Sequence, residues 1–303
     1  MSEGPRVTAV IVSFNTREHL LRCVASLQAH VSLPIEVVVV DNGSDDGSAA
    51  AVRAAHPAAR VVENGANLGF AAACNRGLRE ARAPYGLLLN SDAEVCPGTV
   101  EALARVLDER PEVGIVGPRT VGPDGGPQLS FGPDLTPLAE WRQRRLVIGL
   151  RQGQAAAVRE VTALSAREQE PAWVSAACLL ARKAALDAVG GLDERFFLYE
   201  EDVDLCLRVR RAGWRILYMP AAVVMHHLGK SMDMAPARAR LEYDRSHLRF
   251  YAKHRGPGAM ALLRAYLAGS AAAGWVAALG PGPERRARRR ERRDALRIAL
   301  SRP

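Results

Sequence analysis

The sequence predicts an α/β fold whose central sheet is mainly parallel. In the first third of the chain, short runs rich in β-branched residues alternate with segments of helical period, which is typical of a sheet covered by helices. One of these runs, 35–40, is almost continuously Val and Ile, as in a strand buried on both faces. Strands are expected at 8–13, 35–40, 60–63, 87–90 and 114–117.

A predicted amphipathic helix joins the first two strands. Leu20, Leu21, Val24 and Leu27 recur at helical spacing, so the three elements form a βαβ unit, which we expect to be right-handed. The second strand opens directly into the polar segment 41–48. Ligands of open α/β sheets bind at such carboxyl ends. No GxGxxG pattern occurs here, so a dinucleotide site has little support.

The second half of the chain is less regular. From about 133 to 171 the hydrophobic period is lost in a charged stretch rich in Gln and Arg, which we interpret as a variable insertion or lid. Periodic patterns return from about 172 to 254. They predict a helix after Arg182, a turn at Gly190 and Gly191, an acidic helix start near Glu200, and two short strands around Ile216 and Val223.

The C-terminal segment is apolar first and basic afterwards. Residues 259–279 are rich in Ala and Leu and reach spanning length, but Arg264 lies among them, so we expect a helix that lies in a membrane interface. A helix packed on the domain is an equal alternative. The arginine-rich run after Pro283 is expected to contact anionic lipid, and a solvated tail is the alternative. No nucleic-acid-binding motif accompanies it, so nucleic acid is not expected as a partner.

Length and composition limit the remaining possibilities. The 303 residues are 48% hydrophobic and carry a formal net charge of +8, much of it after Pro283. We expect one domain at 1–255, with halves at 1–118 and 119–255, and a helical basic tail at 256–303. The first apolar run is too short for a signal peptide, so a cytoplasmic protein is expected. Five cysteines without a paired motif are expected to be reduced and mostly buried.

Three acidic positions form a pattern that none of them forms alone. An aspartate at a strand end is more often a turn former or a helix cap. Here Asp41 closes a buried strand, Asp92 follows another strand within Asn90-Ser91-Asp92, and Asp202 lies at a helix start. We expect these carboxylates to gather at one edge of the sheet, as in a site that binds a ligand.

These motifs resemble the family-2 glycosyltransferases, in the right order over about 7–254. Within the family, the chain resembles the rhamnosyltransferase-like branch. This resemblance rests on the Asn-Ser-Asp variant at 90–92 and on the motif His226-x-x-Gly229-x-Ser231. The resemblance implies a GT-A fold and an inverting, metal-dependent transferase. The matching segments are 10–15, 41–48, 67–75, 90–94, 193–208 and 226–231.

The resemblance also implies contacts with a nucleotide sugar. Asp41 would bond the base or ribose, since a carboxylate accepts two donors, and the alternative is a turn residue. In the second loop, glycine lets the backbone approach the ligand, although Asn67 could instead cap a helix. The expected contact residues are Ser13, Phe14, Asn15, Asp41, Asn42, Asn67, Gly69, Asn75, Asn90, Ser91, Asp92, Ser175 and Glu201.

A divalent metal site is implied at Asp92 and His226. Asn90 stands where the family has a first aspartate, so the site has one fewer negative charge. Oxygen ligands suit Mg²⁺ or Mn²⁺, and a histidine favours Mn²⁺. His227 is the competing ligand, but adjacent strand residues face opposite sides, and the spacing to Gly229 favours His226. Glu94 could bind the ion through a water molecule or simply face solvent, and solvent is the favoured expectation.

By the same resemblance, Asp202 is the general base that takes the proton of the acceptor hydroxyl. One carboxylate suffices for a single displacement. Glu201 is the alternative base, and Asp204 with Arg208 is expected to be an i,i+4 ion pair. Ser175 belongs to a small-residue segment under the donor sugar. The aromatic residues Phe196, Phe197 and Tyr199 are expected either to stack on sugar or to join the core.

The resemblance implies transfer of L-rhamnose from dTDP-rhamnose to a polysaccharide or lipid-linked (polyprenyl) acceptor in cell-envelope synthesis, at the inner face of the plasma membrane. Transfer of galactofuranose, N-acetylhexosamine or mannose is the first alternative, because sugar choice depends on pocket shape. A non-catalytic nucleotide-sugar-binding module is the second. Joint presence of Asp92, Asp202 and His226 argues against it.

Overall fold

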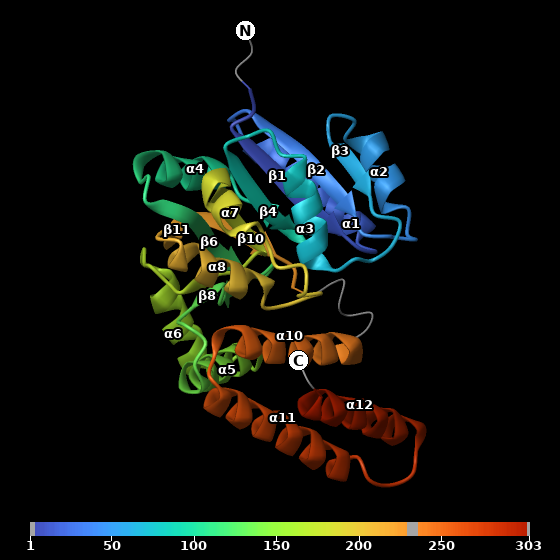
Figure 1. Ribbon diagram of the computed structural model, residues 1–303. Coiled ribbons are helices and arrows are strands. Elements are labelled where there is room, and N and C mark those ends of the chain that lie inside the picture. The colour runs from blue at the N-terminus through green and yellow to red at the C-terminus, as the bar shows by residue number, and fades with distance from the viewer. Residues whose placement is uncertain (1–3, 229–235, 302–303) are drawn as a thin grey trace. The chain divides into compact units, whose positions relative to one another are not determined.

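The computed structural model describes residues 4–228 and 236–301 (Figure 1). Two compact units divide the chain. The first comprises Met1–Arg195 with Asp202–Ser231, and the second comprises Phe196–Glu201 with Met232–Pro303. The short segment that precedes Asp202 therefore belongs to the second unit. The domain boundary expected near residue 255 stays a prediction. In the structure, the helix that ends at His254 belongs to the same unit as the two helices that follow it.

In the described part of the first unit, nine strands form one sheet in the order β3-β2-β1-β4-β10-β6-β11-β5, with β7 paired to β6 (Figure 1). Parallel pairing joins β3, β2, β1 and β4, and also β6 and β11, whereas β10 is antiparallel to both neighbours. The mainly parallel sheet that the sequence predicts is confirmed. The strands are β1 Val7–Ser13, β2 Ile35–Asp41, β3 Arg60–Glu63, β4 Tyr85–Asn90, β5 Ala93–Val95, β6 Val113–Val121, β7 Pro127–Gln128, β10 Cys178–Arg182 and β11 Arg215–His226, while β8 Phe131–Gly132 pairs with β9 Trp173–Val174 in a separate ribbon.

Helices cover both faces of this sheet. The unit contains α1 Arg17–His30, α2 Ser48–Ala55, α3 Phe70–Arg79, α4 Thr99–Glu109, α5 Pro137–Arg151, α6 Ala155–Ser165, α7 Lys183–Val189 and, apart from its first residue, α8 Glu201–Arg211. Side chains alternate along each strand, so Ile11 and Val39 enter a core with α1 and α4, while Val10 and Val38 enter a second core with α3 and α8. Burial on both faces explains the continuous apolar runs.

Two local expectations need correction. The stretch 133–171 is not irregular, because it contains α5 and α6, whose exposed faces carry the charged residues that hid the helical period. The two short strands expected around Ile216 and Val223 are one strand, β11. Its register shifts between Met219 and Val223, where Pro220 lacks the N–H that a regular ladder needs.

All five cysteines are free thiols, as expected. Four are buried, and Cys96 is half-buried. Burial raises the pKa of Cys206 to about 12, and burial together with the Asp92 carboxylate raises the pKa of Cys23 well above its ordinary value. Thiols that stay protonated are poor nucleophiles, so we assign these cysteines to packing.

The second unit is helical. Its helices are α10 Pro236–His254, α11 Pro257–Ala277 and α12 Pro283–Leu300, and α11 and α12 lie side by side as a hairpin (Figure 1). Arg240 of α10 bonds Glu291 of α12 at 2.8 Å. The arginine-rich run is thus a helix within a small bundle. In the part of the chain that the structure describes, α11 is one helix whose length and composition would allow it to cross a membrane.

Glycine at position 77 sets the distance between α3 and the sheet. A Cβ there would lie 2.3 Å from Val10 Cγ1 and 3.1 Å from Val40 Cγ2. We expect Gly77→Ala to lower the free energy of unfolding by about 1–3 kcal/mol through overpacking, despite better helix propensity. Gly269→Ala in α11 is the control, because nothing lies within 4 Å of its added Cβ; it should be neutral or stabilising. Urea unfolding measures both, and equal midpoints would contradict the prediction.

Candidate active site

The carboxyl ends of three parallel strands bring the expected site residues to one edge of the sheet. In the register, Ser13 lies opposite Asp41 and Val12 lies opposite Asn90. The strands β1, β2 and β4 therefore end within a residue of each other. The loops that follow these three strands therefore begin at one common edge of the sheet.

Asp41 is buried at this edge with one carboxylate oxygen unused. It is 3% exposed, and its Oδ2 accepts the Ser44 N–H at 3.0 Å, but Oδ1 is buried and has no hydrogen-bond partner within the described residues. Asn15, at φ 54°, donates its N–H to Ser44 Oγ at 3.0 Å and accepts the Asp45 N–H at 2.9 Å. A buried acceptor left open is costly, so this oxygen is available to a ligand N–H or O–H.

Asn42 and Asn67 hold the two loops of this edge together. The Asn42 amide donates to Asn67 Oδ1 at 2.9 Å and to the Gly69 carbonyl at 3.2 Å, and its oxygen accepts from Asn64 and from Leu68 N–H. These bonds use the full capacity of the Asn42 side chain. Asn67 does not cap α3, whose N-cap is Gly69 at φ 88° without a side-chain cap.

Asn75 lies away from the edge, in α3. Its Nδ2 donates to the Leu192 carbonyl at 2.8 Å and to Glu194 Oε1 at 3.0 Å, while Oδ1 accepts the Leu192 N–H at 2.9 Å. These bonds tie α3 to the segment that follows the Gly190-Gly191 turn, and a Cβ on Gly191 would lie 2.6 Å from Asn75 Oδ1. The structure thus gives Asn75 a bracing role, and its contact with a nucleotide stays a prediction.

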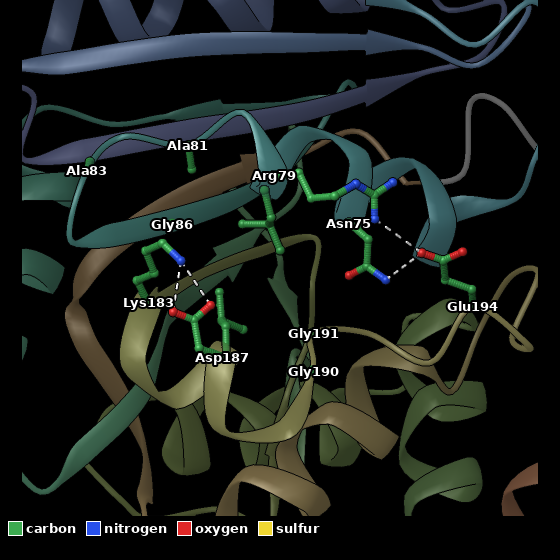
Figure 2. A pocket seen from close by; sticks show the side chains of 12 residues that line it. Asn75, Arg79, Ala81, Ala83, Gly86, Lys183, Asp187, Gly190, Gly191 and Glu194 are labelled. Carbon is green, nitrogen blue, oxygen red and sulfur yellow. Dashed lines mark hydrogen bonds and ion pairs between the residues drawn. The ribbon is translucent and has the colours of Figure 1, made fainter.

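A cavity lies beside Asn75 rather than at the carboxyl edge. It measures about 470 Å³ and lies between α3 and α7, over Gly86 near the start of β4 (Figure 2). Its charged side chains already bond each other, since Lys183 pairs with Asp187 at 2.8 Å and Arg79 lies 3.6 Å from Glu194. Gly86 places the cavity at the end of β4 opposite to Asn90. Because its charged groups are already paired and it lies away from the carboxyl edge, we do not assign a catalytic role to it.

Asp92 meets His226 at the edge, although 134 positions separate them. Asp92 Oδ1 lies 3.2 Å from His226 Nε2, and both residues are less than a tenth exposed. Ser91 Oγ accepts the Thr16 hydroxyl at 2.8 Å, and Thr16 in turn contacts Ser13 Oγ at 3.0 Å. This hydroxyl chain, which the sequence did not reveal at Thr16, fastens the start of the Asp92 loop to β1.

His227 takes a different partner, as strand alternation predicts. Its Nε2 lies 2.8 Å from Glu94 Oε1, and Arg22 lies 3.4 Å from the same carboxylate. The expectation that Glu94 simply faces solvent is wrong, because Arg22 of α1 and His227, which follows β11, both contact its carboxylate. Asp92 with His226 and Glu94 with His227 therefore form two separate pairs.

Asp202 is joined to the same edge by a tight turn between β9 and β10. Its Oδ2 accepts the Ala176 N–H at 3.0 Å and its Oδ1 accepts the Val203 N–H at 2.8 Å. The next carbonyl of the turn, that of Ala177, accepts the Asn90 N–H at 3.0 Å. One turn thus links Asp202 to Asn90, two positions before Asp92, and Asp202 itself remains half-buried.

Ser175 begins this turn. Its Oγ accepts the Ala177 N–H at 3.2 Å, and its own N–H donates to the Ser130 carbonyl at 2.8 Å, so it shapes the turn that holds Asp202. Further along α8, the expected pair is present, with Asp204 fully buried and 2.7 Å from Arg208. Phe14 is half-buried beside Ser13, and Glu201 is buried at the first turn of the helix.

Within the second unit, α10 holds the segment that precedes Asp202. Tyr199 and Glu200 both have positive φ, at 70° and 65°, which costs free energy for residues other than glycine. Glu200 Oε1 lies 2.9 Å from His247 Nδ1, both residues being nearly fully buried, and Ser246 donates to the Leu198 carbonyl at 2.8 Å. No sequence pattern pointed to His247. Phe196 is fully buried, as expected of a core aromatic.

The Asp92–His226 pair fits a divalent cation. It offers one carboxylate and one imidazole, a donor set that suits Mn²⁺ or Mg²⁺ when phosphate and water supply the other ligands. Over residues 4–228 and 236–301, no three His, Cys, Asp or Glu side chains form a closed metal cluster. Such a site would therefore depend on its substrate for the remaining ligands. Gly229 and Ser231, named in the motif, lie outside the described residues.

The sheet and the polar edge together define the class of this protein. The chain matches the family model described as glycosyl transferase family 2 over residues 8–161, about half of its length. It belongs to the family-2 glycosyltransferases, and it is a glycosyltransferase.

Its relatives narrow the resemblance. The chain is 33% identical over 283 residues to the N-acetylglucosaminyl-diphospho-decaprenol L-rhamnosyltransferase of Mycobacterium tuberculosis, covering 87% of this chain and 89% of the relative. It is 32% identical over 225 residues to the pre-mycofactocin glycosyltransferase of the same organism, covering 73% of this chain and 42% of that protein. The resemblance to the rhamnosyltransferase-like branch is confirmed.

Solved structures share the fold. The mannosyltransferase PcManGT from Pyrobaculum calidifontis, in complex with GDP-Man and Mn²⁺, has a TM-score of 0.59 at 20% identity and covers 99% of this chain and 87% of its own. TarS 1–349 from S. aureus has a TM-score of 0.54 at 15% identity, covering 97% and 71%. The predicted GT-A fold is confirmed.

Proposed function

We propose that this glycosyltransferase carries out metal-dependent, inverting sugar transfer at the carboxyl edge of its sheet. The observation that carries the proposal is the buried Asp92–His226 pair, joined through the turn at 175–177 to Asp202. The open Oδ1 of Asp41 at the same edge supports a nucleotide on the β2 side. The diphosphate of the donor would thus lie between the nucleoside, which Asp41 binds, and the general base Asp202.

Each side chain has a task that its surroundings support. Asp41 accepts a hydrogen bond from the base or ribose of the nucleotide. Asp92 and His226 hold the divalent ion, which when bound neutralises charge on the diphosphate leaving group. Asp202 accepts the proton of the acceptor hydroxyl as that oxygen attacks the anomeric carbon, and the carbon–oxygen bond to the diphosphate breaks with inversion. Its two backbone N–H donors hold its carboxylate in place.

The donor we propose is dTDP-L-rhamnose, and the acceptor is a lipid-linked glycan. Support comes from the relative of Mycobacterium tuberculosis, whose name specifies rhamnosyl transfer to a diphospho-decaprenol-linked sugar, and which matches over most of both chains. A lipid-linked acceptor places the reaction at the inner face of the plasma membrane, in the cytoplasm. We assign the membrane contact to the helical tail.

Asp202→Asn tests the base. The amide still accepts a backbone N–H bond but cannot take a proton, so turnover should fall by about 10²–10⁴-fold while donor affinity stays unchanged. Steady-state rates together with calorimetric donor binding separate the two quantities. Glu201→Gln is the comparison, because Glu201 is the alternative base. A collapse of donor affinity in Asp202→Asn, or a larger rate loss in Glu201→Gln, would show that Asp202 has another role.

Matched histidine variants test the metal site. His226→Asn should weaken Mn²⁺-dependent binding of nucleotide diphosphate by at least about tenfold, whereas His227→Asn, which removes the neighbour paired to Glu94, should not. Calorimetric titrations of the nucleotide with Mn²⁺, with Mg²⁺ and with chelator give the difference. Equal losses in the two variants would remove His226 from the metal site.

A donor panel tests the sugar. The purified protein should turn over or slowly hydrolyse dTDP-rhamnose faster than UDP-galactofuranose, UDP-N-acetylhexosamine or GDP-mannose, because the pocket discriminates by its shape. Product analysis by mass spectrometry measures each rate. A clear preference for another donor would replace rhamnose and keep the transferase, whereas nucleotide binding without any turnover would favour a binding module.

A further inference from the structure

Helix α11 presents an uncharged face to solvent. Arg264 is the one charged residue among its 21, and Arg264 bonds the carbonyls of Ala299 and Ser301 at the end of α12. Leu262, Tyr266 and Val276 are each more than half exposed. They recur at spacings of four and ten residues, with Gly269 and Ala273 between them at helical intervals, so they share one side of the helix.

The opposite side of α11 packs within the hairpin. Leu263, Leu267 and Ala271 are buried there, at spacings of four residues. Only 17% of the most apolar 18-residue window of α11 is buried inside the protein. An apolar helix face this long that remains in water is a marker of an interaction surface.

The neighbouring helix α12 forms a cationic cleft with Trp275, near the C-terminal end of α11. It carries eight arginines and three carboxylates. Arg286, Arg289, Arg290 and Arg293 line a cleft of about 240 Å³ together with Trp275 of α11, and no carboxylate is among these lining residues. The arginines recur at three- and four-residue spacing, so they lie on one side of α12, where like charges repel unless an anion lies between them.

The cleft is partly built by bonds within the hairpin. Arg289 donates to the carbonyls of Ala278 at 3.0 Å and Gly280 at 2.8 Å, which fixes its guanidinium against the end of α11. Arg286, Arg290 and Arg293 are exposed. Trp275 is 42% exposed at the same place. An indole beside several guanidinium groups is typical of the boundary between lipid tails and phosphate headgroups.

We propose that the α11–α12 hairpin binds the surface of an anionic phospholipid bilayer, with the cleft of Trp275 and the four arginines on lipid phosphate. The face of Leu262, Tyr266 and Val276 lies in the boundary between headgroups and acyl chains. This deepens the membrane contact that the proposed function assigns to the tail, and it rests on that function only for the choice of membrane. A soluble phosphate would explain the arginines but leave the apolar face unexplained, and so would nucleic acid.

Vesicle binding by the full chain is the first test. The protein should co-sediment with phosphatidylcholine vesicles that contain phosphatidylglycerol, much less with phosphatidylcholine alone, and less at high salt. The variant Arg286→Gln/Arg290→Gln/Arg293→Gln should bind about 100-fold more weakly, at about fivefold per arginine, which corresponds to about 1 kcal/mol each.

Three other exposed arginines provide the matched control. The variant Arg142→Gln/Arg151→Gln/Arg159→Gln changes the net charge equally in α5 and α6 of the first unit, and it should bind vesicles as the unchanged protein does. Circular dichroism and urea midpoints confirm that both variants fold. Equal losses in the two variants, or no preference for anionic vesicles, would overturn the proposal.

Depth quenching tests the apolar face. Lipids brominated on their acyl chains should quench the fluorescence of Trp275, and Trp275→Phe should lose most of this quenching although Trp141 is also exposed. Leu262→Asp should weaken vesicle binding without changing donor hydrolysis. Unchanged quenching in Trp275→Phe would overturn the assignment. Protein that detergent releases from vesicles but high salt does not would also overturn it, because such protein would be inserted into the bilayer rather than bound at its surface.

Two competitors separate the ligand sources. Vesicle binding should persist in the presence of millimolar inorganic phosphate and of duplex DNA, and displacement by either at equal ionic strength would overturn the bilayer proposal. Donor hydrolysis, measured in parallel without vesicles, reports the transferase alone. Loss of hydrolysis with intact vesicle binding would count against the proposed function and leave this inference standing.

Discussion

The register of three parallel strands is the constraint on which the site depends. Because β1, β2 and β4 end within a residue of each other, Ser13, Asp41 and Asn90 reach one edge together. A slip of one residue would turn every side chain of a strand to the other face. The same register that buries Val10 and Val38 in the core therefore aims Asp41 at its site, so the fold and the chemistry cannot be separated.

Most polar groups at this edge bind each other, and this makes the few remaining groups specific. Asn42 and Asn15 use their amides to fix two loops, while Thr16 and Ser91 fix the start of a third. A catalytic arrangement needs such support, because a small displacement of a base or ligand removes much of its effect. What is left for a ligand is the open oxygen of Asp41 and the Asp92–His226 pair.

The sequence predicted the parts that follow from periodicity and from chain order. Val and Ile runs located the strands, and alternation along a strand separated His226 from His227, which the structure pairs with different carboxylates. It could not reveal His247, because its role depends on a contact with Glu200 across 47 positions of the chain. Nor could the sequence show that the Asn75 side chain bonds the Leu192 backbone, because an asparagine at this position is equally compatible with binding a ligand and with bonding a neighbouring loop.

Other misses have local causes. The helices α5 and α6 were hidden because exposed charged residues on both dilute the apolar period. The break expected within β11 reflects Pro220, which interrupts the ladder but not the strand, because residues on both sides still pair with β6. In each case tertiary pairing overrides a local signal, and a single sequence carries no trace of that pairing.

The buried polar groups also bear on how the fold and its ligands are coupled. An aspartate beside a histidine, taken out of water, gains little stability from the pair itself, because desolvation offsets attraction. The open oxygen of Asp41 adds a further cost, and the positive φ of Tyr199 and Glu200 adds another just before Asp202. These are features that folding alone would not favour. A ligand that satisfies them binds the folded chain and not the unfolded one, so the site is where the free energy of ligand binding becomes free energy of folding.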